Sequence, residues 1–455
     1  MEKHFDAIII GAGQAGPALA ARLSTAGQRV AIVERHLVGG TCVNTGCMPT
    51  KTMVASAYAA HLARRGAEYG VVTGPISIDM GRVHARTSRV SSDAQGRDEE
   101  WLRGLENCTL IFGHARFEGG RSVRVGDDVL TAAKIFINVG GRAFIPDMPG
   151  VADVPLLTNS SILKLSTVPA HLVVIGGSYV GLEFAQAFHR FGAEVTVVEK
   201  GERLVGREDE RVSAELQRIF ADEGIAIRTH AECIRFAPHG DKIEVGLTCA
   251  HGAPAIIASH VLMAVGRIPN TGDLGLEAAG IEIDERGYIR VNDRLETTAP
   301  GVWALGDCNG RGAFTHTSYN DFEIVAENLL DGADRKVTDR IACYALYTDP
   351  PLGRVGISAD KARSSGRSVK VGRRPMSRVG RAVEKDETAG FMEIVVDAET
   401  DRILGGTILG TSGDEAIHCI LDMMANDATA DRLRQTVHIH PTVSELLPTI
   451  AGSLE

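Results

Sequence analysis

The sequence predicts an α/β fold built from two parallel-sheet units and a smaller α+β unit at the C-terminal end. Three observations favour this class. The chain has 455 residues, more than one hydrophobic core ordinarily holds, so about three units are expected. A strand, a glycine-rich turn, a helix and a second strand follow one another twice along the chain. From about residue 341 the pattern changes to alternating strands and amphipathic helices without such a turn.

The two glycine turns align without gaps at a constant offset of 165 residues. In chain order the alignment pairs Gly11 with Gly176, Gly13 with Ser178, Gly16 with Gly181, and Glu34 with Glu199. Apolar strands flank each turn, and they are Ala7 to Ile10 with Val30 to Val33, and Leu172 to Ile175 with Val195 to Val198. One such motif is weak evidence, whereas the whole pattern twice in register is typical of Rossmann-like dinucleotide-binding units.

Each part of this motif has a physical role. The glycines let the backbone approach a pyrophosphate at the helix N-terminus, and the glutamate accepts hydrogen bonds from ribose hydroxyls. In the second copy Ser178 adds bulk where the pyrophosphate passes. The sequence therefore predicts two dinucleotide sites, of which the second departs from the pattern at one position.

A pair of cysteines follows the first unit. Cys42 and Cys47 are separated by four residues and precede a helix expected from Pro49 to about Ala63. A helix N-terminus favours a thiolate, because its unpaired backbone N–H groups stabilise negative charge. Two buried free cysteines or half of a metal site are the alternatives. Zinc ligands usually come as CxxC with a second pair nearby, and none follows, so we expect a redox-active dithiol and no metal.

The overall composition excludes several classes of protein. The 48 basic and 58 acidic side chains give a net charge of −10 without a basic block, which argues against a nucleic-acid partner. Eight cysteines are too few for a disulfide framework in a chain of this length. No apolar run approaches the ~20 residues of a membrane helix, and the first strand begins within a few residues of the N-terminus. We therefore expect a cytoplasmic protein without a membrane partner.

The remaining segments complete the expected organisation. A charged helix is predicted over Met80 to Arg103, and prolines at 146, 149 and 155 mark a linker. The second nucleotide unit spans about 151–270. A strand near Val302 then leads through Asp307 into a helix that reaches Ala326. Strands are expected at Phe391 to Val396 and Leu404 to Leu409.

Four motifs closely resemble the flavoprotein disulfide reductases, the family of lipoamide dehydrogenase, glutathione reductase and mercuric reductase. They are GGTCVNTGCMPTK, AVGRIPN, PGVWALGDC and HPTVSE, and the likeness covers nearly the whole chain. The resemblance implies an FAD-binding domain in two parts, 1–150 with the dithiol and 271–340. It also implies an NAD(P)-binding domain at 151–270 and a dimerisation domain at 341–455, which makes the active unit a homodimer.

The resemblance also assigns residues. Lys51 and Glu183 look like the ion pair that the family places beside the flavin, although either alone would be read as a surface residue. Asp307 is expected to bond the flavin ribityl chain. The full FAD side comprises Gly11, Gly13, Gly16, Glu34, Thr41, Lys51, Ala115, Gly140, Glu183, Asp307 and Thr315. The NAD(P) side comprises Gly176, Gly181, Glu199, Gly266 and Arg267.

By the same resemblance, electrons pass from NAD(P)H through FAD and the dithiol to a small disulfide. Cys47 is the thiol next to the flavin and Cys42 the interchange thiol. His440, held by Glu445 and contributed by the other subunit, is the general acid–base, because a released thiolate must be protonated. His438 lacks such an argument and is expected to be structural. Glu199 favours NADH over NADPH, since a carboxylate repels a 2′-phosphate.

Departures from the family patterns narrow the range of possible substrates. Ala21 and Glu323 stand where glutathione reductases carry arginines, which disfavours glutathione disulfide, although Arg22 is adjacent. No cysteine follows Cys419, and the His–Glu pair is retained, so mercury reduction is disfavoured. A lipoamide-like or other low-molecular-weight disulfide is expected. The alternatives are a quinone, metal-ion or diaphorase activity of the flavin itself, and a non-catalytic FAD-containing protein.

Overall fold

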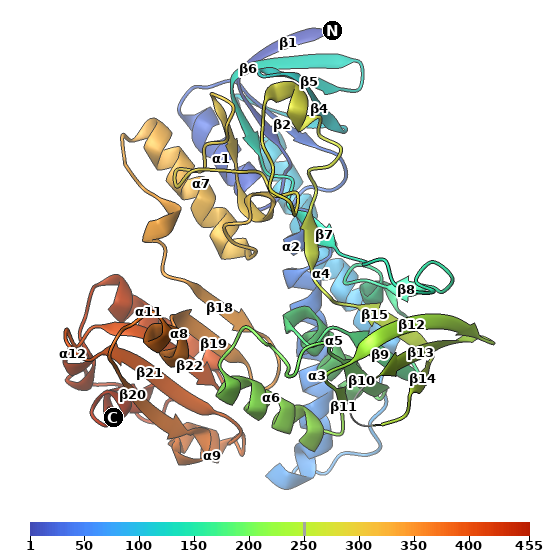
Figure 1. The fold of residues 1–455 in the computed structure, drawn as a ribbon, viewed down its shortest axis with the longest axis vertical. Coiled ribbons are helices and arrows are strands. Elements are labelled where there is room, and N and C mark those ends of the chain that lie inside the picture. Colours follow the sequence, from blue (N-terminus) through green and yellow to red (C-terminus); the bar gives the residue numbers. More distant parts are fainter. Residues whose placement is uncertain (249–251) are drawn as a thin grey trace.

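The computed structural model describes residues 1–248 and 252–455, so Cys249 lies outside the described residues. Figure 1 shows three bodies: the first sheet near the N-terminus, a second sheet beside the long helices, and a C-terminal body. Within the described ranges no helix combines the length and the apolar character needed to cross a membrane.

The first sheet contains seven strands. Their order is β3-β2-β1-β6-β5-β4, and β17 pairs with β6. These strands are β1 (Glu2–Ile10), β2 (Val30–Glu34), β3 (Cys108–Phe112), β4 (Ala115–Gly119), β5 (Ser122–Val125), β6 (Asp128–Ile137) and β17 (Val302–Ala304). The strands β1, β2, β3, β6 and β17 run parallel, as expected for a sheet buried on both faces. Because β17 joins β6, the chain after residue 271 returns to the first sheet.

Helices cover this sheet and connect it to the next one. The helices α1 (Ala15–Thr25) and α7 (Thr315–Leu330) pack against each other, and the short helices of the returning segment are η3 (Leu276–Ala279), η4 (Gly306–Asn309) and η5 (Val337–Asp339). The excursion after β2 comprises α2 (Gly40–Asn44), α3 (Cys47–Arg65), η1 (Gly66–Tyr69) and α4 (Met80–Arg103). The bounds of α4 are those predicted, and the carboxylate of Asp79 caps its N-terminus by accepting from Arg82 N.

The second unit has a five-stranded parallel sheet in the order β11-β10-β9-β15-β8. Its elements are β8 (Leu156–Leu157), η2 (Ile162–Lys164), β9 (His171–Ile175), α5 (Tyr179–Phe191), β10 (Glu194–Val198), α6 (Glu210–Asp222), β11 (Ala226–Arg228) and β15 (His260–Met263). An antiparallel sheet adds β12 (Glu232–His239), β13 (Lys242–Thr248) and β14 (Ala255–Ala258). The ribbon of β7 (Gly141–Ala143) and β16 (Arg267–Pro269) pairs the two connections between the units.

The C-terminal body is α+β, as predicted. Its antiparallel sheet has the order β18-β19-β22-β21-β20. Its strands are β18 (Cys343–Leu346), β19 (Leu352–Gly356), β20 (Val369–Pro375), β21 (Phe391–Asp397) and β22 (Ile403–Leu409). Its helices are α8 (Ala359–Ser364), η6 (Met376–Arg378), α9 (Gly380–Glu384), α10 (Gly413–Ala416), α11 (His418–Ala425), α12 (Ala430–Arg434), η7 (Ser444–Leu446) and α13 (Leu447–Ala451).

Candidate active site

The first glycine of each turn is required by both conformation and space. Gly11 has φ +104°, and a Cβ there would lie 2.3 Å from the carbonyl oxygen of Asn138. Gly176 has φ +112°, and its Cβ would lie 2.4 Å from the carbonyl oxygen of Ala264. Residues with a side chain rarely adopt this backbone region, and no side chain fits either gap. The two turns are therefore built in the same way, as the sequence alignment predicts.

The third glycine of each turn lets the following helix pack close to the strand. A Cβ on Gly16 would lie 2.3 Å from the carbonyl oxygen of Gly11, and one on Gly181 would lie 2.1 Å from that of Gly176. The helices that begin here, α1 and α5, have no side-chain cap at their N-termini. No side chain therefore competes with a ligand at either helix end, although Gly16 N already donates to the carbonyl of Gly13 at 2.9 Å, and this arrangement fits a pyrophosphate at each turn.

The middle position of the turn differs from the other two. At Gly13 the nearest atom to an added Cβ is 3.6 Å away, which is ordinary van der Waals distance. Ser178 occupies the equivalent position in the second turn and is exposed. The protein's own packing therefore does not demand glycine here, and a ligand passing over the turn would supply the constraint.

The two strand-terminal glutamates brace the turns through matching hydrogen bonds. Glu34 accepts from the backbone N–H groups of Ala12 and His36, at 2.9 and 2.8 Å. Glu199 accepts from Gly177 and Gly201, both at 2.7 Å. The donors are related by the same offset of 165 residues, since Ala12 pairs with Gly177 and His36 with Gly201. The sequence alignment is therefore consistent with the matching hydrogen bonds. The ribose-binding role proposed for both glutamates is additional to this bracing.

The two cysteines of the predicted dithiol lie on consecutive helices, Cys42 on α2 and Cys47 at the first position of α3. Both are free thiols. A hydrogen bond from Cys42 lowers the pKa of Cys47 to about 6, helped by the hydroxyl of Thr315 and the charge of Lys51. The same hydrogen bond, together with burial, raises the pKa of Cys42 far above its ordinary value. The shared proton therefore stays on Cys42 and the negative charge on Cys47.

Thr315 reaches this thiol from a distant part of the sequence. It is the first residue of α7, and its Oγ1 lies 3.2 Å from Cys47 Sγ. The cysteine is itself the first residue of α3, so the thiolate faces the N-terminal ends of two helices. Both helix ends favour negative charge at this point. The sequence placed Thr315 on the FAD side but gave no sign of this contact.

Lys51 and Glu183 form an ion pair that joins three parts of the chain. The ammonium Nζ of Lys51 on α3 donates to both carboxylate oxygens of Glu183 on α5, at 3.0 and 2.8 Å. Glu183 is buried, and it also accepts from the backbone N–H of Tyr347 at 3.0 Å. The ammonium lies 4.6 Å from the centre of the Tyr347 ring. The geometry is that of a fixed internal pair and not of two surface side chains.

The remaining predicted residues lie on several different elements. Thr41 is on α2, Ala115 is buried at the start of β4, and Gly140 follows β6. Gly266 accepts a hydrogen bond from the backbone N–H of Phe144 at 3.0 Å. These positions show how the chain arranges the residues, whereas their contacts with a cofactor remain predictions.

Arg267, which the sequence assigns to the NAD(P) side, also contacts a residue assigned to the FAD side. Its Nε is 3.8 Å from Asp307 Oδ2, and its guanidinium donates to the carbonyl of Gly141. Burial raises the pKa of Asp307, and the charge of Arg267 opposes that rise. An arginine assigned to the NAD(P) side thus contacts an FAD-side carboxylate, because β16 crosses between the two units.

The predicted acid–base pair is formed in the C-terminal body. His440 Nδ1 lies 2.7 Å from Glu445 Oε2, and the side chain of the histidine is 80% exposed whereas that of the glutamate is 11% exposed. The neighbouring apolar side chains Val437 and Ile439 are also exposed, at 95% and 79%. Exposed apolar residues beside a fixed histidine are typical of a surface that another chain covers.

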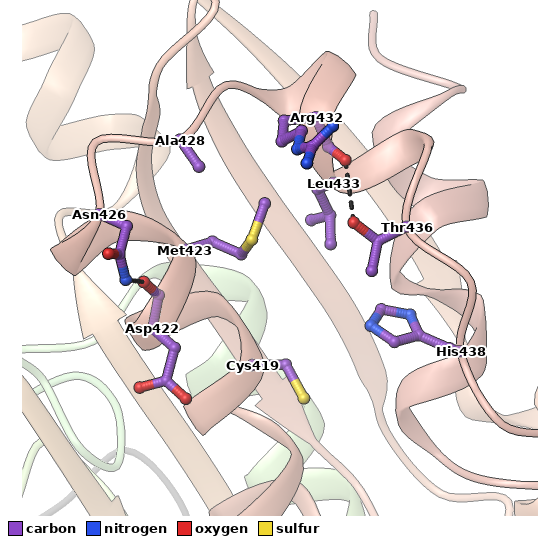
Figure 2. A pocket seen from close by; sticks show the side chains of 9 residues that line it. All are labelled: Cys419, Asp422, Met423, Asn426, Ala428, Arg432, Leu433, Thr436 and His438. Atoms are coloured by element: carbon purple, nitrogen blue, oxygen red, sulfur yellow. Dashed lines mark hydrogen bonds between the residues drawn. The ribbon is translucent and has the colours of Figure 1, made fainter.

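His438 differs from His440 in its surroundings. Its ring lies against a groove of about 540 Å³ between α11 and α12, near Cys419 and Met423 (Figure 2). Burial lowers the pKa of His438, and its Nδ1 has no hydrogen-bond partner among the described residues. The structural role expected of His438 from the sequence stays a prediction.

Comparison with known proteins identifies the family. Residues 5–321 match the family model described as pyridine nucleotide-disulphide oxidoreductase. The chain belongs to the pyridine nucleotide-disulphide oxidoreductase family. Residues 343–451 match the dimerisation domain of the same family, which indicates a homodimer. Members of this family are FAD-dependent and use NAD(P)H, and the two glycine turns, whose helix N-termini carry no side-chain cap, fit two such nucleotides.

Several relatives cover almost the whole chain. The probable pyridine nucleotide-disulfide oxidoreductase RclA of Escherichia coli is 35% identical over 97% of this chain and 98% of its own. A dihydrolipoyl dehydrogenase of Thermus scotoductus is 34% identical over 99% and 98%. A mercuric reductase of Bacillus cereus is 31% identical over 97% of this chain and 70% of its own.

A solved structure agrees with these sequence matches. The HOCl-induced flavoprotein disulfide reductase RclA of Escherichia coli superposes with a TM-score of 0.90, at 34% identity over 98% of this chain and 99% of that chain. Together the similarities place this pyridine nucleotide-disulphide oxidoreductase among the flavoprotein disulfide reductases. They include relatives named for different substrates, so they support the class of reaction and leave the substrate to the chemistry of the site.

Proposed function

We propose that the protein is an NAD(P)H-dependent, FAD-containing reductase that passes electrons through the Cys42–Cys47 dithiol to a small disulfide. The observation that carries this proposal is the asymmetry of the dithiol. Cys47 opens α3 and lies 3.2 Å from Thr315 Oγ1, and these contacts together with the hydrogen bond from Cys42 lower its pKa to about 6, whereas Cys42 keeps its proton. Such an arrangement separates a charge-bearing thiol from an exchanging thiol. When bound, FAD supplies the two-electron chemistry that re-reduces the dithiol at the expense of NAD(P)H.

The chain's own residues carry the exchange with the substrate. Cys42 Sγ gives up its proton and attacks one sulfur of the substrate disulfide, forming a mixed disulfide and releasing the first thiolate. Cys47 then attacks Cys42 Sγ, which closes the Cys42–Cys47 disulfide and releases the second thiolate. The first departing thiolate takes the proton given up by Cys42, and the second takes a proton from solvent because Cys47 reacts as a thiolate, so one disulfide is reduced while the dithiol is oxidised.

A base must take the proton of Cys42 and return it to the first leaving sulfur. We assign this to His440 of the partner subunit, since the exposed dyad lies beside apolar residues on the dimerisation domain. Glu445 accepts from Nδ1, which fixes the ring orientation and the neutral tautomer with Nε2 free. Nε2 is then the atom that exchanges the proton.

A lipoamide-like or other low-molecular-weight disulfide fits this site better than glutathione disulfide. Glu323 on α7 is anionic where a carboxylate-binding arginine would be needed, and Ala21 has no charge. Arg22, the nearest alternative, is paired with Asp331 at 2.5 Å. A substrate rich in carboxylates thus finds no free cation at these positions.

We further propose that NADH is the preferred coenzyme. Glu199 is fixed at the second turn by two backbone donors, where its charge would face a 2′-phosphate. Two like charges a few ångströms apart near a surface cost about 1–4 kcal/mol, or roughly tenfold to several hundredfold in kcat/KM. Lys200 and Arg207 follow and offset part of this repulsion, whereas Arg203 donates to the carbonyl of Glu208. A kcat/KM ratio that favours NADPH would contradict this assignment.

We further propose that the protein works in the cytoplasm. Every cysteine in the described ranges is a free thiol, which fits the reducing conditions of the cytoplasm.

The second candidate function is direct reduction of quinones or metal ions by the flavin. It is favoured by the mercuric reductase relatives and by the solved Cu(II) complex of RclA. Against it stands the retained pair of thiols with its asymmetric protonation, which direct reduction by the flavin does not need.

The experiment that separates these candidates is steady-state NADH oxidation with lipoamide, low-molecular-weight disulfides, quinones and metal ions. Wild type is compared with Cys42→Ser and with the variant in which both cysteines are serine. We expect disulfide reduction to be lost in both variants while quinone turnover persists. Quinone or metal-ion turnover that survives in both variants, without any disulfide reduction by wild type, would favour the second candidate.

A further inference from the structure

A buried carboxylate outside the dithiol site lies between the second nucleotide unit and the C-terminal body. The side chain of Glu208 is 1% exposed. Its Oε1 accepts hydrogen bonds from the hydroxyls of Tyr179 and Tyr344, both at 2.6 Å. Arg354 Nη1 lies 4.0 Å from the other oxygen and 3.0 Å from Asp209. Burial and the charge of Glu208 raise the pKa of both tyrosines, so both hydroxyls remain donors.

Glu208 is attached to the second glycine turn from two directions. Tyr179 is the first residue of α5, directly after the turn. The segment that leads from β10 to Glu208 folds back over the turn, and Val205 N donates to the carbonyl of Gly177 at 2.8 Å. The carboxylate is therefore held in a fixed position relative to the nucleotide-binding turn.

A stack of aromatic rings extends from Glu208 to the dithiol. The ring of Tyr344 stacks on Phe314, with centroids 5.6 Å apart and planes 9° from parallel. Phe314 in turn stacks on His316 at 5.3 Å and 10°. Thr315, between these two residues in sequence, makes the 3.2 Å contact with Cys47 Sγ. The first turn of α7 therefore packs against the ring of Tyr344, and the hydroxyl of that ring donates to Glu208.

The same region has a second attachment to β18. His316 Nε2 lies 2.7 Å from the carbonyl oxygen of Cys343, the residue before Tyr344. The start of α7 is therefore attached to the start of β18 by two contacts, an aromatic stack and a hydrogen bond. A shift of Tyr344 would be transmitted to Thr315, because stacked rings and a short hydrogen bond resist relative sliding.

We propose that Glu208 is a positioning residue for the dithiol, which holds Tyr344 and, through Phe314, places the Thr315 hydroxyl against Cys47. This inference rests on the proposed function only in taking Cys47 as the charge-bearing thiol. Removing the carboxylate leaves two partly buried hydroxyls without their acceptor, and the tyrosines must turn to find another. The second nucleotide unit and the thiolate are coupled by this contact.

The test measures the protonation of Cys47 itself. In the FAD-loaded dimer, reduced by two electrons, a Cys47 thiolate gives long-wavelength charge-transfer absorbance, which is lost as the thiolate is protonated. Its midpoint is titrated in wild type, Glu208→Leu, Thr315→Val and the double variant. We expect Glu208→Leu to raise the midpoint by about half to one pH unit, and the double variant to shift no further than Thr315→Val alone.

Two further variants keep the test decisive. Tyr344→Phe keeps the stacked ring and removes one hydroxyl, so it should shift the midpoint in the same direction even if Glu208→Leu does not fold. Glu215→Gln is the matched control, because Glu215 bridges the same two bodies by accepting from Gly390 N at 2.9 Å without touching the aromatic stack. Its midpoint should equal that of wild type.

The outcomes separate this inference from the proposed function. Wild-type midpoints in Glu208→Leu and Tyr344→Phe, an equal shift in Glu215→Gln, or a shift that adds to that of Thr315→Val would each overturn the positioning role. The titration needs no disulfide substrate. An enzyme that reduces no disulfide yet shows the predicted non-additive shift would lose the proposed function and keep the role of Glu208.

Discussion

Replacing Thr315 with valine should raise the pKa of Cys47 without altering the shape of the site. The change removes the Oγ1 atom 3.2 Å from Cys47 Sγ and adds a methyl group of similar size. A hydrogen bond to a charged acceptor contributes about 1.5–3 kcal/mol, and sulfur is a weak acceptor, so the lower end applies. Because about 1.4 kcal/mol corresponds to one pKa unit, the pKa should rise by about one unit from its value near 6.

The assay is the pH titration of the thiolate absorbance in the reduced, FAD-loaded protein. A raised pKa means that Cys47 is protonated, and the absorbance lost, at a higher pH than in wild type. Thr315→Ser is the matched control, since it keeps the hydroxyl and should retain the wild-type midpoint. The reasoning fails if Thr315→Val titrates with wild type, or if Thr315→Ser shifts as far as Thr315→Val.

Three further results are expected. Gly16→Ala places a Cβ 2.3 Å from the carbonyl of the turn's first glycine, so the purified protein should carry little FAD by absorbance, and a full complement would refute this. Lys51→Met leaves Glu183 buried without its cation and should cost about 2 kcal/mol of stability, seen as a lower unfolding midpoint. Adding Glu183→Gln should recover part of that loss, and an unchanged midpoint in the single variant would contradict the pair's importance. Mixing inactive Cys42→Ser and His440→Ala subunits should restore one competent site in each heterodimer, whereas proven subunit exchange without activity would exclude catalysis across the interface.

Much of the architecture could be predicted from the sequence because its signals are local or repeated. The helix Met80–Arg103 has the predicted bounds, since the N-cap residue Asp79 directly precedes it and the periodic charged face lies within it. The dithiol helix begins at Cys47, two residues before the expected start at Pro49, because proline is tolerated throughout the first turn. The two glycine turns were found by comparing the chain with itself.

The contacts that tune the site were not predictable in the same way. Thr315 meets Cys47, and Tyr347 meets Glu183, across long stretches of sequence, and only the packing of separate bodies brings them together. Glu208 carries no motif, since its role depends on two tyrosines supplied by different bodies. Local pattern gives the position of each element, whereas these hydrogen bonds depend on how the elements meet.

The most direct test of the disulfide reductase account is a single-turnover reoxidation experiment. The enzyme is reduced with NADH and mixed rapidly with lipoamide, a series of low-molecular-weight disulfides, quinones or Hg(II), and the flavin spectrum is followed in wild type and Cys42→Ser. We predict that at least one small disulfide reoxidises the wild-type enzyme rapidly and leaves Cys42→Ser reduced. The account is contradicted if no disulfide reoxidises the enzyme while a quinone or metal ion does so equally fast in both proteins.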